Sequence, residues 1–313
     1  MNYGKLKIFA GSSHPAFAQA VADGVGVPLG KVECLRFSNE NIMVRILESV
    51  RGADVFVIQT MAPPVSDNIL ESLIMIDALA SSSAARITAV LPYFPYSRSD
   101  KKDQPRVSIT ARLMADLYEQ AGAHRFLTTD LHAPQITGFF HKPVDQLIAA
   151  PVICDYYRKR DLANHVLVAG DAGEAKELAR YAARLDLPMA IVDKRRYGND
   201  DKAKATNLIG DVRDKHCLII DDEIATGGTL MEAMTFLKRN GALSVSAAAV
   251  HGVLSSNAHI KLTNSEFDEI VVCDTVPVEH KKTDKIHILS VADQFADAIK
   301  RIHTDQSCSD LFR

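Results

Sequence analysis

The chain of 313 residues lacks the features that mark several classes of protein. It has no strong charge of one sign: its formal net charge is −3, whereas dedicated nucleic-acid binders usually carry a clear basic excess. No apolar run approaches the ~20 residues that span a bilayer. The apolar stretch near its start is too short for a secretory signal. We therefore expect neither a nucleic-acid partner nor a membrane partner.

Cysteine is also scarce. The five cysteines form no CxxC pair, and their spacing is not that of a metal site. Cys217 and Cys273 lie within apolar runs, so we expect them to be buried as small hydrophobic side chains. An odd number of cysteines without a disulfide framework is typical of a reducing compartment, and the sequence predicts a cytoplasmic location.

Short apolar runs alternate with longer helical patterns along the whole chain. The predicted strands are Leu6–Ala10, Val55–Gln59, Ile87–Leu91, Arg125–Thr128, Val166–Ala169, Met189–Val192, Cys217–Ile220, Val245–Val250 and Glu269–Cys273. Many are almost continuously apolar, as in strands that are buried on both faces. Predicted helices include Asn68–Ser81, Ser108–Ala121 and Thr229–Asn240. This alternation indicates an α/β fold, with a mostly parallel sheet covered by helices.

The length favours two domains, because single hydrophobic cores stop growing at roughly 250–300 residues. A weak boundary signal lies at Ala149–Pro151, where a proline interrupts the pattern. Each half has a strand that ends in an aspartate-containing loop, at Thr129–His132 and at Asp221–Glu223. A duplication of one α/β unit would explain this, although the two halves are too different to establish it.

The most informative segment is Cys217–Thr229, in which an apolar strand ends in two carboxylates and a Thr-Gly-Gly-Thr turn opens a helix. The N-terminus of a helix offers backbone N–H groups and a positive dipole end to a phosphate. Gly227 and Gly228 allow the backbone to approach the anion closely, and Asp221 and Asp222 can accept hydrogen bonds from sugar hydroxyls. Thr229 and Glu232 have the spacing of a capping box, and Gly241 fits the end of the helix.

Other segments, in their order along nearly the full chain, resemble one family. They include Arg36–Ser38, Tyr96–Arg98, Thr129–Ala133, Asp193–Arg196 and Val272–Thr275. Together they are similar to the ribose-phosphate diphosphokinases, or phosphoribosyl pyrophosphate synthetases. The resemblance implies two phosphoribosyltransferase-like domains, 1–149 and 150–313, with the final helix packing back on the first domain. The implied reaction transfers the diphosphoryl group of Mg-ATP to the anomeric hydroxyl of ribose 5-phosphate, giving phosphoribosyl diphosphate and AMP.

The resemblance also implies the roles of individual residues. Lys194 and Arg196 match the catalytic cations of a loop over the reacting phosphates, and His132 and Asp171 match the magnesium positions. The implied ATP-binding residues are Phe37, Asn39, Asn41, Arg98 and Ser99. The implied ribose 5-phosphate residues are Arg196, Asp221, Asp222, Ala225, Thr226, Gly227, Gly228 and Thr229.

Regulation and assembly are implied in the same way. Gln135, Ser307 and Ser309 resemble parts of an effector site at which phosphate activates and ADP inhibits. In the family the Phe37 segment reaches the active site of a neighbouring subunit, which implies a homo-oligomer built from dimers, with a hexamer as one form.

Several positions depart from the family pattern. Asn41 stands where an acid is usual, Ala225 where an aspartate is common, and Ser99 where a glutamine is common. Glu174 and Glu177 replace a glycine and an arginine. Two alternatives therefore stay open: a regulatory, weakly active paralogue, and a type I phosphoribosyltransferase that uses the same ribose-phosphate loop. Because Lys194 is present, the sequence favours an active enzyme.

Overall fold

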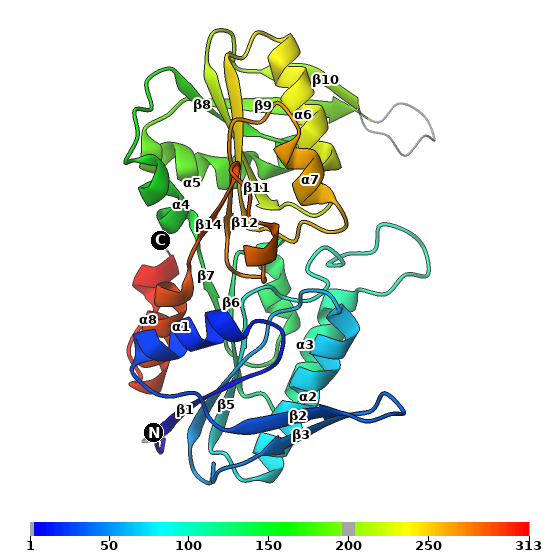
Figure 1. Ribbon diagram of the computed structural model, residues 1–313, viewed down its shortest axis with the longest axis vertical. Helices are drawn as coiled ribbons and strands as arrows, with labels where there is room; N and C mark the ends of the chain where they lie inside the picture. The colour runs from blue at the N-terminus through cyan, green and yellow to red at the C-terminus, as the bar shows by residue number, and fades with distance from the viewer. Residues whose placement is uncertain (1–2, 196–203, 313) are drawn as a thin grey trace. The chain divides into compact units, whose positions relative to one another are not determined.

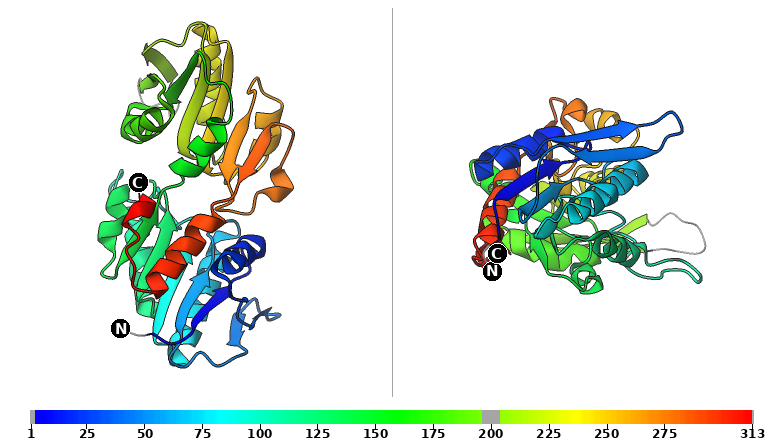
Figure 2. Two further views of the ribbon diagram at one scale, coloured as in Figure 1. Left: turned by 90° about the vertical axis from the view of Figure 1, so that its left-hand side faces the viewer. Right: turned by 90° about the horizontal axis from the view of Figure 1, so that it is seen from below.

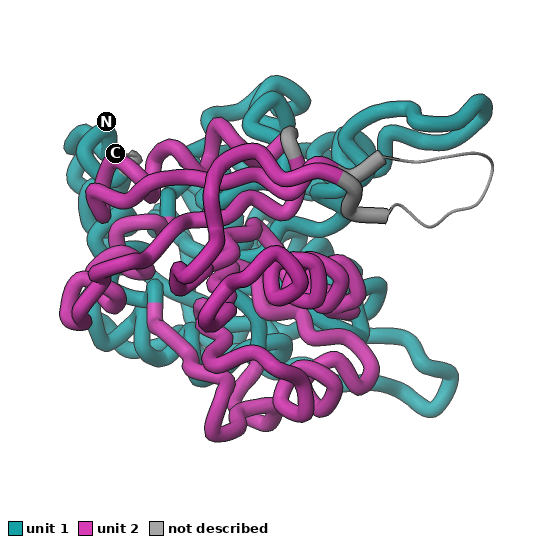
Figure 3. Tube along the Cα trace, turned by 90° about the horizontal axis from the view of Figure 1, so that it is seen from above, with its two compact units in different colours: residues 1–148, 275–277, 291–313 teal, residues 149–274, 278–290 magenta. Residues whose placement is uncertain are grey.

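Two parallel sheets form the framework of the chain (Figure 1). The computed structural model describes residues 3–195 and 204–312. By its internal contacts the chain divides into two units (Figure 3). Unit 1 consists of residues 1–148, 275–277 and 291–313, and unit 2 of residues 149–274 and 278–290. The C-terminal residues 291–313, which the sequence predicts as part of the domain 150–313, thus group with unit 1.

Unit 1 has a five-stranded sheet of order β1-β4-β5-β6-β7, in which every pairing is parallel. Its strands are β1 (Leu6–Ala10), β4 (Asp54–Ile58), β5 (Arg86–Leu91), β6 (Arg125–Thr129) and β7 (Val144–Leu147). An antiparallel hairpin of β2 (Val32–Arg36) and β3 (Ile42–Ile46) extends away from this sheet (Figure 2). All residues of β4 and β5 are buried, as expected of central parallel strands.

Helices cover both faces of the unit 1 sheet (Figure 1). They are α1 (Pro15–Val25), α2 (Val65–Ser81), α3 (Thr110–Ala121) and α8 (Ala292–His303), with 3-10 turns η1 (Pro134–Phe139) and η4 (Ser309–Phe312). On one face α1 packs on α8, where the Phe17 and Phe295 rings meet edge to face at 5.4 Å. On the other face α2 and α3 close a core that includes Met75, Tyr118 and Phe126.

Unit 2 has a seven-stranded sheet of order β10-β9-β8-β11-β12-β13-β14, parallel except for β9–β10. Its strands are β8 (His165–Ala169), β9 (Met189–Arg195), β10 (Lys204–Ile209), β11 (His216–Glu223), β12 (Ser244–His251), β13 (Ile270–Cys273) and β14 (Ile286–Leu289). Its helices are α4 (Ala150–Tyr157), α5 (Ala175–Leu185), α6 (Gly228–Arg239) and α7 (Ala258–Thr263), with 3-10 turns η2 (Ala172–Glu174) and η3 (Glu279–Lys281). Helices α4 and α5 lie on one face and α6 and α7 on the other (Figure 1).

The predicted α/β class with mostly parallel sheets is confirmed. Within residues 3–195 and 204–312, no helix combines the length and the apolar character that are needed to cross a membrane. Cys217 and Cys273 are buried, as predicted, and the five cysteines are free thiols.

Candidate functional site

The acidic segment of the predicted ribose-phosphate loop belongs to the strand before it. We expected the strand to end at Ile220, but β11 continues to Glu223, and Glu223 is in register with His251 of β12. On the other side, pairing with β8 stops at Ile220 and Ala169. The acids therefore belong to the end of β11, which stays paired with β12 after its pairing with β8 has ended. There they are half-buried and do not lie on an open loop.

Asp221 is held by the backbone that follows it. Its Oδ1 accepts a hydrogen bond from the Asp222 N–H at 2.8 Å and a longer one from the Glu223 N–H at 3.5 Å. Burial, followed by the negative charge of Glu174 and the contact with Asp222, raises the pKa of Asp221 to about 9. The Asp222 side chain is also hydrogen-bonded to the Asp221 carboxyl, so the two acids contact each other at the end of the strand.

Backbone hydrogen bonds hold the turn that follows the acids. The Ile224 N–H donates to the His251 carbonyl at 2.9 Å, and the Ala225 carbonyl accepts from the Ser255 N–H at 2.9 Å. Ile224 is buried, whereas Thr226, Gly228 and Thr229 are exposed. The anchored backbone thus leaves the glycine-threonine edge of the turn open to a ligand.

Helix α6 starts directly from this turn. Its N-cap is Gly227, which has a left-handed φ of +74°, and a Cβ there would lie 3.3 Å from the Leu262 side chain. The first N–H bonded within the helix is that of Met231, which donates to the Gly227 carbonyl at 3.0 Å. The preceding N–H groups at the start of α6 can therefore bind an anion.

The predicted capping box is wrong. Helix α6 begins at Gly228 and has no side-chain cap, so Thr229 already lies inside the first turn, where its hydroxyl cannot act as the N-cap. The predicted end of the helix is confirmed, because Gly241 has a φ of +94° and its N–H donates to the Lys238 carbonyl.

Asp171 and Glu174 close the turn between β8 and α5. The Asp171 Oδ1 accepts hydrogen bonds from the Gly173 N–H at 2.7 Å and from the Glu174 N–H at 3.3 Å. The Glu174 Oε2 accepts from the Gly170 N–H at 2.8 Å. Asp171 is exposed, and its hard carboxylate oxygen suits a magnesium ion.

The other predicted catalytic and metal residues are distributed over the chain. Lys194 lies on β9, in register with Ala205 of β10, and Arg196 lies outside the described residues. His132 is exposed after β6 in unit 1, whereas Asp171 belongs to unit 2. No group of three or more His, Cys, Asp or Glu side chains that could hold a metal occurs among residues 3–195 and 204–312.

The predicted adenine residues occupy the tip of the β2–β3 hairpin. The Phe37 N–H donates to the Asn41 carbonyl at 2.9 Å, and the Asn39 Oδ1 accepts from the Asn41 N–H at 3.2 Å. Half of the Phe37 surface is exposed, which excludes a core role for this ring within its own unit. The Asn39 side chain helps to form the turn.

The predicted ATP-phosphate residues follow β5. Arg98 is exposed and can reach a ligand. Ser99 is half-buried, and its hydroxyl lies 3.5 Å from the Ser108 carbonyl and 3.4 Å from the Thr110 N–H. These contacts close the segment that leads into α3, so the Ser99 side chain has a structural role as well.

The predicted effector residues lie at two places in unit 1. Ser307 donates through its hydroxyl to Ser309 at 3.0 Å, and the Ser309 N–H donates back to the Ser307 Oγ at 3.2 Å. Arg301 fixes this turn by donating to the Ser307 carbonyl at 3.0 Å. Gln135 instead donates weakly to Asp100, at 3.4 Å.

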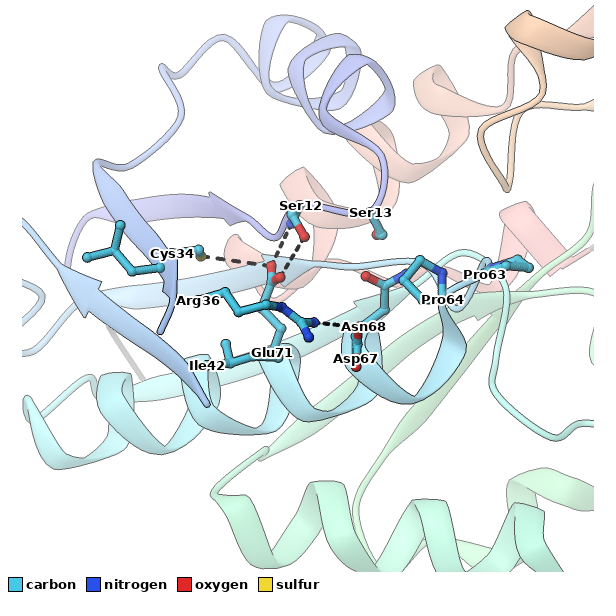
Figure 4. A pocket seen from close by; sticks show the side chains of 11 residues that line it. Ser12, Ser13, Cys34, Arg36, Ile42, Pro63, Pro64, Asp67, Asn68 and Glu71 are labelled. Carbon is cyan, nitrogen blue, oxygen red and sulfur yellow. Dashed lines mark hydrogen bonds and ion pairs between the residues drawn. The ribbon is translucent and has the colours of Figure 1, made fainter. Parts of the chain in front are cut away.

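A cavity of about 340 Å³ in unit 1 was not predicted from the sequence. It lies between the β2–β3 hairpin and the start of α2, and its lining includes Ser12, Glu71 and the ion pair of Arg36 with Asp67 (Figure 4). The Glu71 carboxylate accepts from the Ser12 N–H at 2.6 Å and from its hydroxyl at 2.5 Å. These partners are 59 positions apart in the chain, which is why no local motif reveals them.

An α/β sheet with paired acids at its carboxyl edge, followed by a glycine turn at a helix N-terminus, defines a protein that binds phosphorylated ligands. Family models agree on a narrower class: residues 6–122 match the N-terminal domain of ribose phosphate pyrophosphokinase, and residues 197–313 match the phosphoribosyl synthetase-associated domain.

Curated relatives match over the whole length. The chain is 48% identical to the ribose-phosphate pyrophosphokinase of Caldanaerobacter subterraneus subsp. tengcongensis, over 98% of both chains. It is 45% identical to that of Deinococcus radiodurans, again over 98% of both. Among solved structures, phosphoribosylpyrophosphate synthetase from Mycobacterium smegmatis superposes with a TM-score of 0.92 at 39% identity, covering 96% of this chain and 100% of that one.

The chain belongs to the ribose-phosphate pyrophosphokinase family. The predicted family and enzyme class are thereby confirmed, and neither alternative, a regulatory paralogue or a type I phosphoribosyltransferase, is favoured by these matches.

Proposed function

We propose that the protein transfers the diphosphoryl group of ATP to the anomeric hydroxyl of ribose 5-phosphate. The anomeric oxygen attacks the β-phosphorus, and the bond from that phosphorus to the oxygen bridging it to the α-phosphorus breaks. AMP leaves with the bridging oxygen, the hydroxyl proton passes to water, and phosphoribosyl diphosphate forms. The observation that carries this proposal is the open turn at Thr226–Thr229 beside Asp222, on a chain that matches the family from end to end.

The sugar phosphate would bind at the start of α6. Its phosphate would accept from the N–H groups of the first helical turn, with hydroxyl donors from Thr226 and Thr229. Asp222 would accept from a sugar hydroxyl, whereas Asp221, which is already engaged by the backbone, would hold the strand end in place. Gly227 keeps the turn in the conformation that exposes these groups.

The nucleotide would use residues of the hairpin tip and of the segment after β5. Phe37 would stack on the adenine ring, Asn39 and Asn41 would contact its edge, and Arg98 would neutralise the phosphates. Lys194 and Arg196 would stabilise the charge that develops during transfer. A magnesium ion bound to the nucleotide would offset the charge of the reacting phosphates.

Asp171 fits a magnesium ion better than His132 does. The Asp171 carboxylate is exposed, and only its Oδ1 is used in the turn hydrogen bonds described above. Mg²⁺ prefers oxygen ligands and keeps several waters, so the His132 imidazole would act through a bound water.

Assembly and regulation are part of the same proposal. The exposed Phe37 ring supports a contact of the hairpin tip with a second copy, hence a homo-oligomer built from dimers or a hexamer. Light scattering during gel filtration tests this: a monomer at micromolar concentration would contradict it.

Gln135, Ser307 and Ser309 would take part in phosphate activation and ADP inhibition, and a flat initial rate across a phosphate titration would count against that role. The cytoplasmic location stays a prediction.

The activity is tested by incubating the protein with ribose 5-phosphate, Mg²⁺ and ATP. AMP and phosphoribosyl diphosphate should form in equal amounts, and Lys194→Ala should abolish both. No turnover with ATP, GTP, CTP or ADP as donor would overturn the proposal in favour of a regulatory paralogue. Consumption of phosphoribosyl diphosphate with a free base, without ATP, would indicate a phosphoribosyltransferase instead.

A further inference from the structure

The proposed ribose-phosphate turn is attached by its backbone to residues 252–255, the segment that follows β12. The Leu254 N–H donates to the Ile224 carbonyl at 2.9 Å, and the Ser255 N–H donates to the Ala225 carbonyl at 2.9 Å. The turn itself starts at the next residue. The orientation of this segment therefore decides where the turn presents its N–H groups to a phosphate.

The segment has a conformation that its own sequence does not favour. Leu254 is fully buried and has a left-handed φ of +45°, which is uncommon for a residue with a side chain. The preceding backbone is packed closely against β13, since a Cβ on Gly252 would lie 2.7 Å from the Val272 Cβ. A backbone outlier of this kind persists only where its surroundings hold it.

Lys281 supplies one of these holding contacts. Its Nζ donates to the Val253 carbonyl at 2.8 Å, within unit 2. The Val253 carbonyl and the Leu254 N–H belong to one peptide group, so Lys281 binds one end of that group while the Ile224 carbonyl binds the other. Hydrogen bonds from a charged donor are stronger than those from a neutral one. Lys281 is half-buried, and burial lowers the pKa of its ammonium group.

We propose that Lys281 is a positioning residue for ribose 5-phosphate, whose ammonium group orients the Val253–Leu254 peptide group and through it the phosphate-binding turn. The inference rests on the proposed function. Loss of a hydrogen bond to a charged donor shifts an equilibrium roughly tenfold or more, so Lys281→Met should raise the KM for ribose 5-phosphate about tenfold. The groups that act on the transferred phosphates lie elsewhere, so kcat should change little.

The neighbouring residue offers a matched control. Lys282 is exposed, and Lys282→Met removes the same charge without removing the contact with Val253. Lys281→Arg keeps a charged donor and serves as the conservative variant. High salt separates positioning from attraction of the substrate at a distance, because it screens exposed charges but leaves a direct hydrogen bond in place.

The test combines kinetics at saturating Mg-ATP with hydrogen exchange, read by mass spectrometry on peptides that span residues 252–256. Lys281→Met should show the higher KM at low and at high salt, together with faster exchange of the Leu254 and Ser255 amides. Lys282→Met and Lys281→Arg should match the original protein in both measurements.

The inference alone is overturned by an unchanged KM or unchanged exchange in Lys281→Met, by an equal rise of KM in Lys282→Met, or by a rise that disappears at high salt. Faster exchange throughout unit 2 would also overturn it, because Lys281 would then act on general stability. No turnover by the original protein would overturn the proposed function, and the inference with it.

Discussion

Replacement of Arg86 by methionine should destabilise unit 1 strongly, because it leaves a buried carboxylate with too few partners. Asp54 is fully buried and accepts from the Arg86 Nε at 2.8 Å and from its Nη2 at 2.6 Å. Arg86 also donates to the Ile302 carbonyl at 2.9 Å, and the His303 Nδ1 lies 2.8 Å from Asp54. These contacts join the C-terminal helix α8 to the amino ends of β4 and β5.

Breaking a buried ion pair costs roughly 3–5 kcal/mol when one charge is left behind. His303 still contacts Asp54 in the variant, so we expect about 3 kcal/mol, the lower end of that range. In a unit of this size the melting temperature should fall by about 6–12 °C.

Arg45→Met is the matched control. Arg45 pairs with Glu33 at 2.7 Å on the hairpin, but 63% of its side chain is exposed, so its removal should cost less than about 1 kcal/mol. The melting temperatures of both variants are measured by calorimetry. A double variant that adds Asp54→Asn to Arg86→Met should recover part of the lost stability. Equal melting temperatures for the two single variants would refute the reasoning.

Three further predictions concern individual side chains. Gly227→Ala should cost about 1 kcal/mol of stability through its left-handed φ and raise the KM for ribose 5-phosphate. Gly52→Ala, at a similar φ of +70° with no atom within 4 Å of the new Cβ, should lose stability with an unchanged KM. Equal KM values for the two variants would contradict the role of the turn. Because the pKa of Asp221 is raised to about 9, the folded state keeps a proton between about pH 4 and 9 that the unfolded state has lost, so stability should fall as pH rises through that window. Asp221→Asn should flatten the dependence of melting temperature on pH, and parallel curves for the two proteins would refute this. Burial and the nearby Glu71 raise the pKa of Cys34 to about 11, so iodoacetamide should modify this thiol slowly at pH 8 and faster in Glu71→Gln. Fast labelling of Cys34 in the unchanged protein would contradict the raised pKa.

The central strands could be predicted because each is long and apolar enough to be recognised alone. Strand β1 begins and ends at the predicted residues. The fully buried β4 is shifted by one residue at both ends, and β5 begins one residue earlier than predicted. The edge strands β7 and β14 were missed: they are four residues long, and half or more of their residues are only partly buried, which weakens the pattern. The hairpin β2–β3 was missed for the same reason, since Val44 is the only residue of its two strands that is buried.

The candidate site was predictable in its residues but not in its geometry. The glycine turn and the acids are adjacent in the sequence, so a local motif reveals them. The motif does not reveal that β11 continues to Glu223, because this continuation depends on pairing with His251 of β12. Nor does it reveal that Glu174 lies beside Asp221, since two strands and their register bring them together.

The most direct test of the proposed reaction follows the β- and γ-phosphorus of ATP in separate labelling experiments with ribose 5-phosphate and Mg²⁺. Both labels should appear in the sugar product, with AMP as the only nucleotide product and no label in it. Transfer of the γ-label alone with formation of ADP, or release of labelled orthophosphate without a labelled sugar, would contradict diphosphoryl transfer.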